Sequence, residues 1–234
     1  MKILGMQGND TAAKDATKGS RLIPICLLVG FAALVVAVAV LCLVEYRSLP
    51  DNVGRELTSE EEAAIIAENS PLTDYIALSP NADFPREDEI TKITVHHMAG
   101  NLSLEELGSR FTNRDRRASS NYAIDSEGNV ALYVEEGNRA WTSSNRENDE
   151  RAITIEVAND EEGGNWHVSD AAFEKLIDLC VDICKRNGIT TFTYTGDETG
   201  TLTTHGMFNE DTICPGPYLN SRLSEFANRV NSRL

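Results

Sequence analysis

The chain has 234 residues, of which 25% are charged and 41% are hydrophobic, and its formal net charge is −16. These values exclude a collagen-like or wholly disordered chain, and the length suits one medium-sized domain with additional segments. The acidic balance argues against sequence-independent nucleic-acid binding, which requires clustered Lys and Arg, so no nucleic-acid partner is expected. Three of the five cysteines lie outside an N-terminal apolar run, and this odd number argues against a disulfide framework.

Residues 22–44 form an apolar run without a charged side chain. A helix of this length extends roughly 34 Å, which is enough to cross the hydrocarbon core of a bilayer. The basic residues that precede the run are Lys2, Lys14, Lys18 and Arg21. The positive-inside rule therefore predicts a cytoplasmic tail over residues 1–21, a transmembrane signal anchor over residues 22–44 and an external remainder, as in a single-pass protein of the cell membrane. A cleaved signal peptide is the competing interpretation.

Residues 45–88 are polar and acidic and contain four prolines, which is typical of a solvated spacer. Within them, Ser59-Glu60-Glu61-Glu62 matches a capping box, and an alanine-rich stretch follows it. We therefore expect an acidic linker that contains one short helix.

From residue 89 to residue 234 the pattern is that of a packed catalytic domain. Strands are predicted over 93–96, 122–124, 130–134, 152–157 and 191–194, with a hairpin turn at Gly128 between the second and the third. Helices are predicted after Ser103, after Ser169 and from Pro217, because each begins at a capping signal and then repeats apolar residues at helical spacing. Strands and helices alternate, so the expected fold class is α/β, with a mixed central sheet flanked by helices and preceded by the transmembrane helix.

The histidines and one cysteine indicate a metal site. The domain contains His96, His97, His167 and His205, and Cys214 follows His205 by nine residues. Imidazole and thiolate are ligands that zinc prefers, and three protein ligands leave one position open for catalysis. The spacing between His205 and Cys214, taken alone, favours a loop histidine and a buried cysteine over a metal site.

Four separated motifs, in this order, resemble those of the zinc-dependent N-acetylmuramoyl-L-alanine amidases, a family that includes phage lysozyme-type amidases and peptidoglycan-recognition proteins. They are Val95-His96-His97-Met98-Ala99, Ser120-Asn121-Tyr122, Arg151 to Val157, and His205 to Gly216 with its Cys-Pro-Gly segment. The resemblance covers roughly residues 75–234. It implies a mixed sheet with helices packed on it and one zinc ion at the end of the sheet.

The resemblance also assigns roles by position. His96, His205 and Cys214 are implied as the zinc ligands, and His97 as a neighbour that packs beside the site or contacts substrate. Glu156 is implied as the general acid and base, and Tyr122 as a donor to the carbonyl oxygen of the substrate. Thr212 stands where some relatives carry a lysine that stabilises the transition state. Trp141 is a candidate either for stacking on a sugar or for packing in the core.

The function that the resemblance implies is hydrolysis of the amide between N-acetylmuramic acid and L-alanine in peptidoglycan, by water that zinc activates. Two alternatives stay open at this stage. The domain could bind wall fragments without cutting them, or it could be a prophage endolysin with the same chemistry.

Overall fold

The computed structural model describes residues 30–40 and 49–234, in two separate units that divide at residue 49. Residues 30–40 are helical, and their large apolar side chains, such as Phe31 and Leu34, are exposed. Within the described ranges, no helix combines the length and the apolar character needed to cross a membrane. The predicted cytoplasmic tail lies outside the described residues, as do both ends of the predicted anchor, 22–29 and 41–44.

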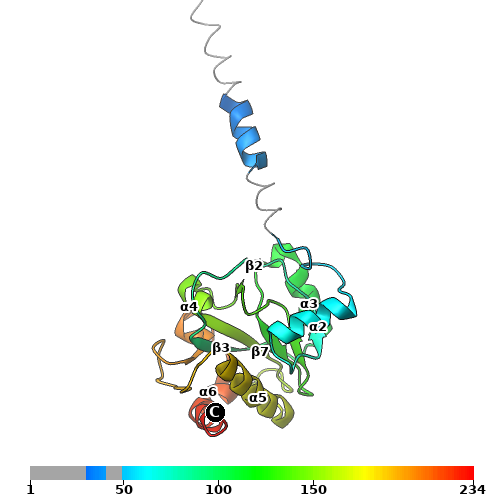
Figure 1. Ribbon diagram of the computed structural model, residues 1–234. Helices are drawn as coiled ribbons and strands as arrows, with labels where there is room; N and C mark the ends of the chain where they lie inside the picture. The colour runs from blue at the N-terminus through cyan, green and yellow to red at the C-terminus, as the bar shows by residue number, and fades with distance from the viewer. Residues whose placement is uncertain (1–29, 41–48) are drawn as a thin grey trace, which may run out of the picture. The chain divides into compact units, whose positions relative to one another are not determined.

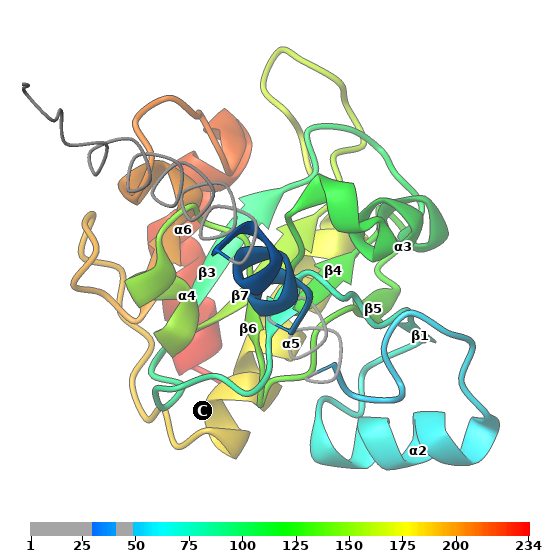
Figure 2. The same ribbon diagram turned by 90° about the horizontal axis from the view of Figure 1, so that it is seen from above.

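A six-stranded mixed sheet forms the centre of the unit made by residues 50–234. Its order is β1-β5-β4-β7-β3-β8, and only the β4–β5 pair is antiparallel. Figure 2 shows β3, β7 and β4 side by side. In this order the strands are Tyr75–Ile76, Val130–Leu132, Tyr122–Ile124, Ala152–Val157, Lys92–His97 and Leu202–Thr204. The predicted hairpin and the central strands are confirmed.

Helices α5 (Asp170–Arg186) and α6 (Gly216–Asn231) cover one face of this sheet (Figure 1). Ser169 is the N-cap of α5, because its hydroxyl group accepts a hydrogen bond from the Ala172 amide. The position of Ser169 directly before the apolar periodicity predicts this cap. The other face is partly covered by α3 (Leu104–Thr112), which begins with the predicted capping box of Ser103. The remaining helical segments are α2 (Ser59–Glu68), α4 (Arg146–Arg151), η1 (Arg114–Arg116) and η2 (His205–Met207).

Alternation along the strands separates an apolar face from a polar one. On β7, Ile153, Ile155 and Val157 pack in the core beneath α5 and α6. The residues between them, including Thr154 and Glu156, point to the opposite face because successive side chains of a strand alternate. Next to α3 this second face carries apolar residues that include small alanines. Toward β3 and β8 it carries buried hydroxyl groups that form hydrogen bonds with one another, such as those of Thr94 and Thr203, whose oxygen atoms are 2.8 Å apart.

The linker prediction for residues 45–88 is wrong from residue 50 onward, because this segment belongs to the compact unit. β1 extends the central sheet by pairing in parallel with β5, and β2 (Ala82–Asp83) pairs with β6 (Arg139–Ala140) in a second, two-stranded sheet. Ile65 of α2 and Leu78 are buried in the main core. The short helix is confirmed, but its cap is Thr58 with Glu61, one residue earlier than expected.

The strand predicted over residues 191–194 is wrong. This segment has no ladder partner, and its Phe192 is instead held by the side chain of Asn231 on α6 through both of its backbone groups. The strand that completes this edge is β8, ten residues later, which ends next to the predicted ligand His205.

Candidate metal centre

The parallel strands β3 and β7 bring His96 and Glu156 to the same end of the sheet. His96 lies directly opposite Glu156 in the register, so both side chains leave the sheet on the face that α5 and α6 do not cover. Both residues are close to the carboxyl ends of their strands, where open α/β sheets place their binding sites.

His205 and Cys214 reach the same place from a later part of the chain. β8 pairs with β3 and ends at Thr204, so His205 is the first residue beyond the sheet. The loop then returns, and Cys214 precedes α6 by two residues. The amide of Gly206 donates to the carbonyl of Cys214 at 3.0 Å, which ties the two loop ends together.

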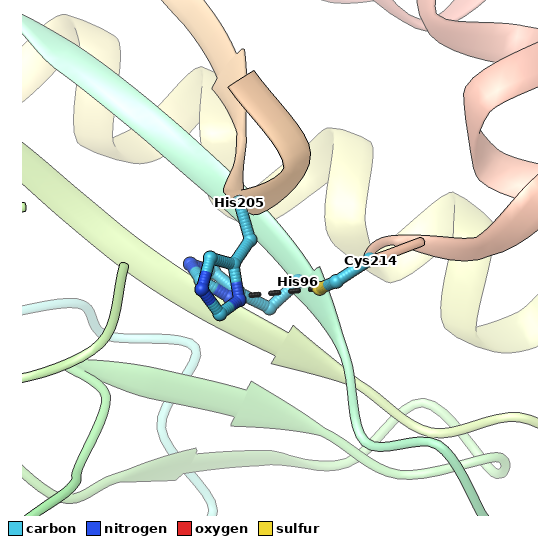
Figure 3. A group of neighbouring side chains, drawn as sticks. All are labelled: His96, His205 and Cys214. Carbon is cyan, nitrogen blue, oxygen red and sulfur yellow. Dashed lines mark hydrogen bonds between the residues drawn. The ribbon is translucent and has the colours of Figure 1, made fainter. Parts of the chain in front are cut away.

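One donor atom of each of His96, His205 and Cys214 lies within 4.8 Å of the other two (Figure 3). The Cys214 Sγ is 3.6 Å from Nδ1 of His96, and the two imidazole rings have centroids 4.8 Å apart. The three residues predicted as zinc ligands are therefore brought together, although 109 positions separate the first from the second along the chain.

The chemistry of this group fits a metal ion. Nε2 of His96 and Nε2 of His205 are buried and have no hydrogen-bond partner within the described residues. Buried polar atoms normally have hydrogen-bond partners, so two imidazole nitrogens without such partners beside a thiol fit the binding of a metal ion. Two imidazoles and one thiolate are a donor set that zinc accepts, with one position left open.

Electrostatics favour neutral histidines at this site. Burial holds the pKa of His96 well below its usual value, and the neighbouring His205 and His97 lower it further. Burial also lowers the pKa of His205. Neutral imidazole is the form that binds metals.

The environment of the Cys214 thiol favours its neutral form, which is not the form that binds a metal. Its burial, together with the nearby Glu156 carboxylate, raises the pKa of Cys214, while the amide of His97 donates to Sγ at 3.4 Å and opposes this increase. The thiolate therefore requires a nearby cation, and a divalent metal ion would provide it.

Glu156 is an isolated acid beside these three side chains. Its Oε2 atom is buried without a hydrogen-bond partner in the described part of the chain, and burial raises its pKa to about 8, with Arg116 acting in the opposite direction. A carboxyl group with a pKa near neutrality can both accept and donate a proton, which is the property that a general acid and base needs.

A cavity of about 440 Å³ opens over this group. Its lining includes all three predicted ligands, Glu156, Thr212, Trp141 and His97. Of the eight predicted site residues, seven are thus gathered around one cavity.

Three of these residues also have structural partners. The Thr212 hydroxyl accepts the amide of Cys214 at 3.1 Å, and the Trp141 indole donates to Asp83 at 3.0 Å. His97 is 8% exposed, with Nδ1 bonded to Asn159 at 3.0 Å and its ring packed edge-on against Trp166. His97 therefore supports the wall of the cavity, on the opposite side of β3 from His96.

Tyr122 is the exception, and its predicted role at the substrate carbonyl is wrong. Tyr122 pairs with Ile155, so its side chain enters the core face of the sheet, whereas Ala123 is the residue that shares the face of Glu156. Its hydroxyl is fully buried, donates to Glu136 at 2.7 Å and accepts the Ser70 amide at 3.0 Å.

We expect Tyr122→Phe to lower stability and leave catalysis intact. The substitution removes one partner of a buried carboxylate and one of a buried amide, at a cost of about 1–3 kcal/mol. Chemical denaturation and steady-state kinetics test this together. A folded variant whose turnover falls by two orders of magnitude or more would return Tyr122 to the mechanism.

The sequence predictions missed two arginines that line the cavity, Arg110 and Arg116. A usable signal was present, because residues 110–117 contain four arginines in a chain of strongly negative net charge.

Comparison with known proteins identifies the family. Residues 86–217, more than half of the chain, match the N-acetylmuramoyl-L-alanine amidase family. The chain belongs to this family. The comparison with curated proteins finds no match.

Three solved structures illustrate the similarity of the fold to known proteins. A point mutant of PlyL matches with a TM-score of 0.53 and 17% identity, over 68% of this chain and 98% of that one. The catalytic domain of XlyA matches with a TM-score of 0.51 and 14% identity, over 68% and 99%. A selenomethionine derivative of AmpD matches with a TM-score of 0.50 and 18% identity, over 69% and 95%. At these identities the similarity concerns the fold.

Proposed function

We propose that this amidase hydrolyses its bond in the cavity above His96, His205 and Cys214, and that these three residues hold one zinc ion. The chain is a peptidoglycan hydrolase of the N-acetylmuramoyl-L-alanine amidase family, whose scissile bond joins N-acetylmuramic acid to L-alanine. The observation that carries the proposal is the approach of three donor atoms to within 4.8 Å of one another, beside the Glu156 carboxyl group, whose buried Oε2 atom has no hydrogen-bond partner among the described residues.

A bound zinc ion would supply a Lewis acid that polarises the substrate carbonyl and makes water a stronger acid. The donor set supports zinc in particular, because two nitrogens and one sulfur are softer than the oxygen ligands that magnesium and calcium select. The resemblance of the four sequence motifs to those of zinc-dependent amidases also supports zinc.

Glu156 supplies the proton transfers. It takes a proton from the attacking water as the carbon–oxygen bond forms and passes it to the alanine nitrogen as the carbon–nitrogen bond breaks. The products are the free carboxyl group of the muramic acid and the free amine of the alanine, so water is consumed and the carboxyl group of Glu156 returns to its initial state.

Thr212 and Trp141 position the substrate. The Thr212 hydroxyl accepts one hydrogen bond from Cys214, so its own proton remains available to a substrate oxygen. The half-buried indole of Trp141 is fixed through Asp83 and lines the cavity, where its ring offers a flat apolar surface to a sugar.

The predicted membrane anchor remains part of the proposal. Its support is the uncharged run over residues 22–44 and the exposed apolar side chains of the helical residues 30–40. A reporter fused to the C-terminus is expected to be accessible from outside intact spheroplasts. A signal confined to the cytoplasm would contradict this topology.

Digestion of purified peptidoglycan tests the activity. Mass analysis is expected to show glycan strands with intact lactyl groups and stem peptides that begin with a free L-alanine amine. Binding to the wall without release of these amines would favour the non-catalytic alternative. A prophage endolysin would give the same products, because its chemistry is the same.

A further inference from the structure

Four exposed arginines, which we call the arginine turn, occupy the end of α3 and the segment η1: Arg110, Arg114, Arg116 and Arg117. Within residues 49–234, none of them has an ion pair or a side-chain hydrogen bond. Eight other arginines of this range each contact a carboxylate, and the half-buried Arg86 donates to backbone carbonyl groups. The arginine turn is therefore distinct in leaving its charges unpaired.

The backbone of the arginine turn is held rigidly. Asn81, only 2% exposed, donates from its amide group to the carbonyls of Phe111 and Asn113, at 2.9 Å each. Asn113 in turn accepts the amide of Asp115 at 3.0 Å. A fixed backbone with free guanidinium groups is preorganised for a ligand, because binding orders only the side chains.

Two residues of the arginine turn lie at the cavity proposed as the catalytic site. Arg110 and Arg116 line the same cavity as His96 and Glu156, whereas Arg114 and Arg117 are not part of its lining. A substrate whose scissile amide lies beside Glu156 therefore brings its neighbouring groups within reach of these two guanidinium groups.

We propose that Arg110 and Arg116 bind a carboxylate of an acidic stem peptide and so determine which peptidoglycan the enzyme prefers. The inference rests on the proposed amidase function, since the stem peptide begins with the alanine of the scissile bond. A guanidinium group matches the planar shape of a carboxylate and donates two parallel hydrogen bonds to it. A carboxamide at the same position cannot form this charged pair.

The test compares two substrates that differ only in charge. These are N-acetylmuramoyl-L-alanyl-D-glutamic acid and its diamide, in which both carboxylates are carboxamides. We expect kcat/KM of the wild-type zinc-loaded enzyme to be about 10- to 100-fold higher for the acid, the size of one charge-assisted contact. The preference should decrease as the salt concentration rises, because the pair is partly exposed to solvent.

The double variant Arg110→Gln and Arg116→Gln is expected to reduce the ratio of kcat/KM for the acid to kcat/KM for the diamide to about one. The matched control, Arg114→Gln with Arg117→Gln, removes the same charge from the same turn and is expected to keep the preference. The single variant Arg116→Gln is expected to fall between the double variant and the wild type.

Equal kcat/KM values for the two substrates in the wild type would overturn the proposal, as would a preference that survives in the first double variant. If the enzyme cleaves neither substrate, the amidase function fails separately. Calorimetric titration with the same two compounds then decides the arginine proposal. Tighter binding of the acid than of the diamide, lost in the Arg110→Gln and Arg116→Gln variant, would support it. Equal affinities of the wild type for the two compounds would overturn it.

Discussion

His205→Ala is expected to remove the metal ion and abolish hydrolysis of peptidoglycan. His205 supplies one of the three donor atoms that the described residues bring together at the site, and two remaining ligands hold a divalent cation weakly. We expect a loss of activity of at least about 10³-fold, since the Lewis acid contributes several kcal/mol to the transition state. Metal content by mass spectrometry and the release of alanine amines from purified wall measure both effects.

His167→Ala is the matched control for this variant. His167 is a half-exposed histidine that bonds to Asp160 at 2.6 Å and does not line the cavity. Its replacement is expected to leave metal content and turnover unchanged. Full activity of His205→Ala without bound metal would contradict the assignment of the site.

Glu156→Gln is expected to keep the metal ion and lose most of the turnover. The amide has nearly the same shape as the carboxyl group but cannot carry a proton between water and the leaving amine, and general acid–base catalysis typically contributes about 10²- to 10⁴-fold. Zinc content measured alongside the turnover rate separates this effect from metal loss. Glu161→Gln, at an exposed acid, serves as the control, and unchanged turnover in Glu156→Gln would remove Glu156 from the mechanism.

The same variant has a consequence for the stability of the metal-free protein. The folded-state pKa of Glu156, about 8, lies above its value of 4.5 in an unfolded chain. Between these values the unfolded chain releases a proton that the folded protein retains, so the contribution of Glu156 to stability decreases as the pH rises from about 4.5 to about 8. The full shift corresponds to at most about 4–5 kcal/mol.

Glu156→Gln removes this titration. Urea denaturation in the presence of a chelator is expected to show that the change in stability from pH 5 to pH 8 is more favourable for the variant than for the wild type, because only the wild type loses stability when Glu156 ionises. An identical pH dependence in the two proteins would mean that the pKa of Glu156 is not raised by burial.

Local signals predicted the elements that carry the core. The capping box at Ser103, the cap at Ser169 and the turn at Gly128 each define an element end through contacts a few residues apart, and all three are found in the structure. Long-range pairing was not predictable in this way. β1 is only two residues long and becomes part of the sheet because β5 lies beside it, so residues 50–88 resembled a linker in sequence alone.

The site residues also divide into those that a local motif predicts and one whose place depends on long-range pairing. His96 and Glu156 followed from their positions in the motifs, and both side chains emerge on one face of the sheet. Tyr122 matched the motif as well, yet its register with Ile155 on β7 turns it into the core. The register between two strands depends on the packing of the whole sheet, and no local pattern around Tyr122 specifies it.

X-ray absorption at the zinc edge of the purified enzyme tests the metal site most directly. We predict one sulfur ligand at about 2.3 Å and two imidazole nitrogens at about 2.0–2.1 Å, with a lighter atom completing the shell. The sulfur contribution should disappear in Cys214→Ser. A zinc ion without a sulfur ligand, or a purified active enzyme without zinc, would contradict the assignment of His96, His205 and Cys214 as its ligands.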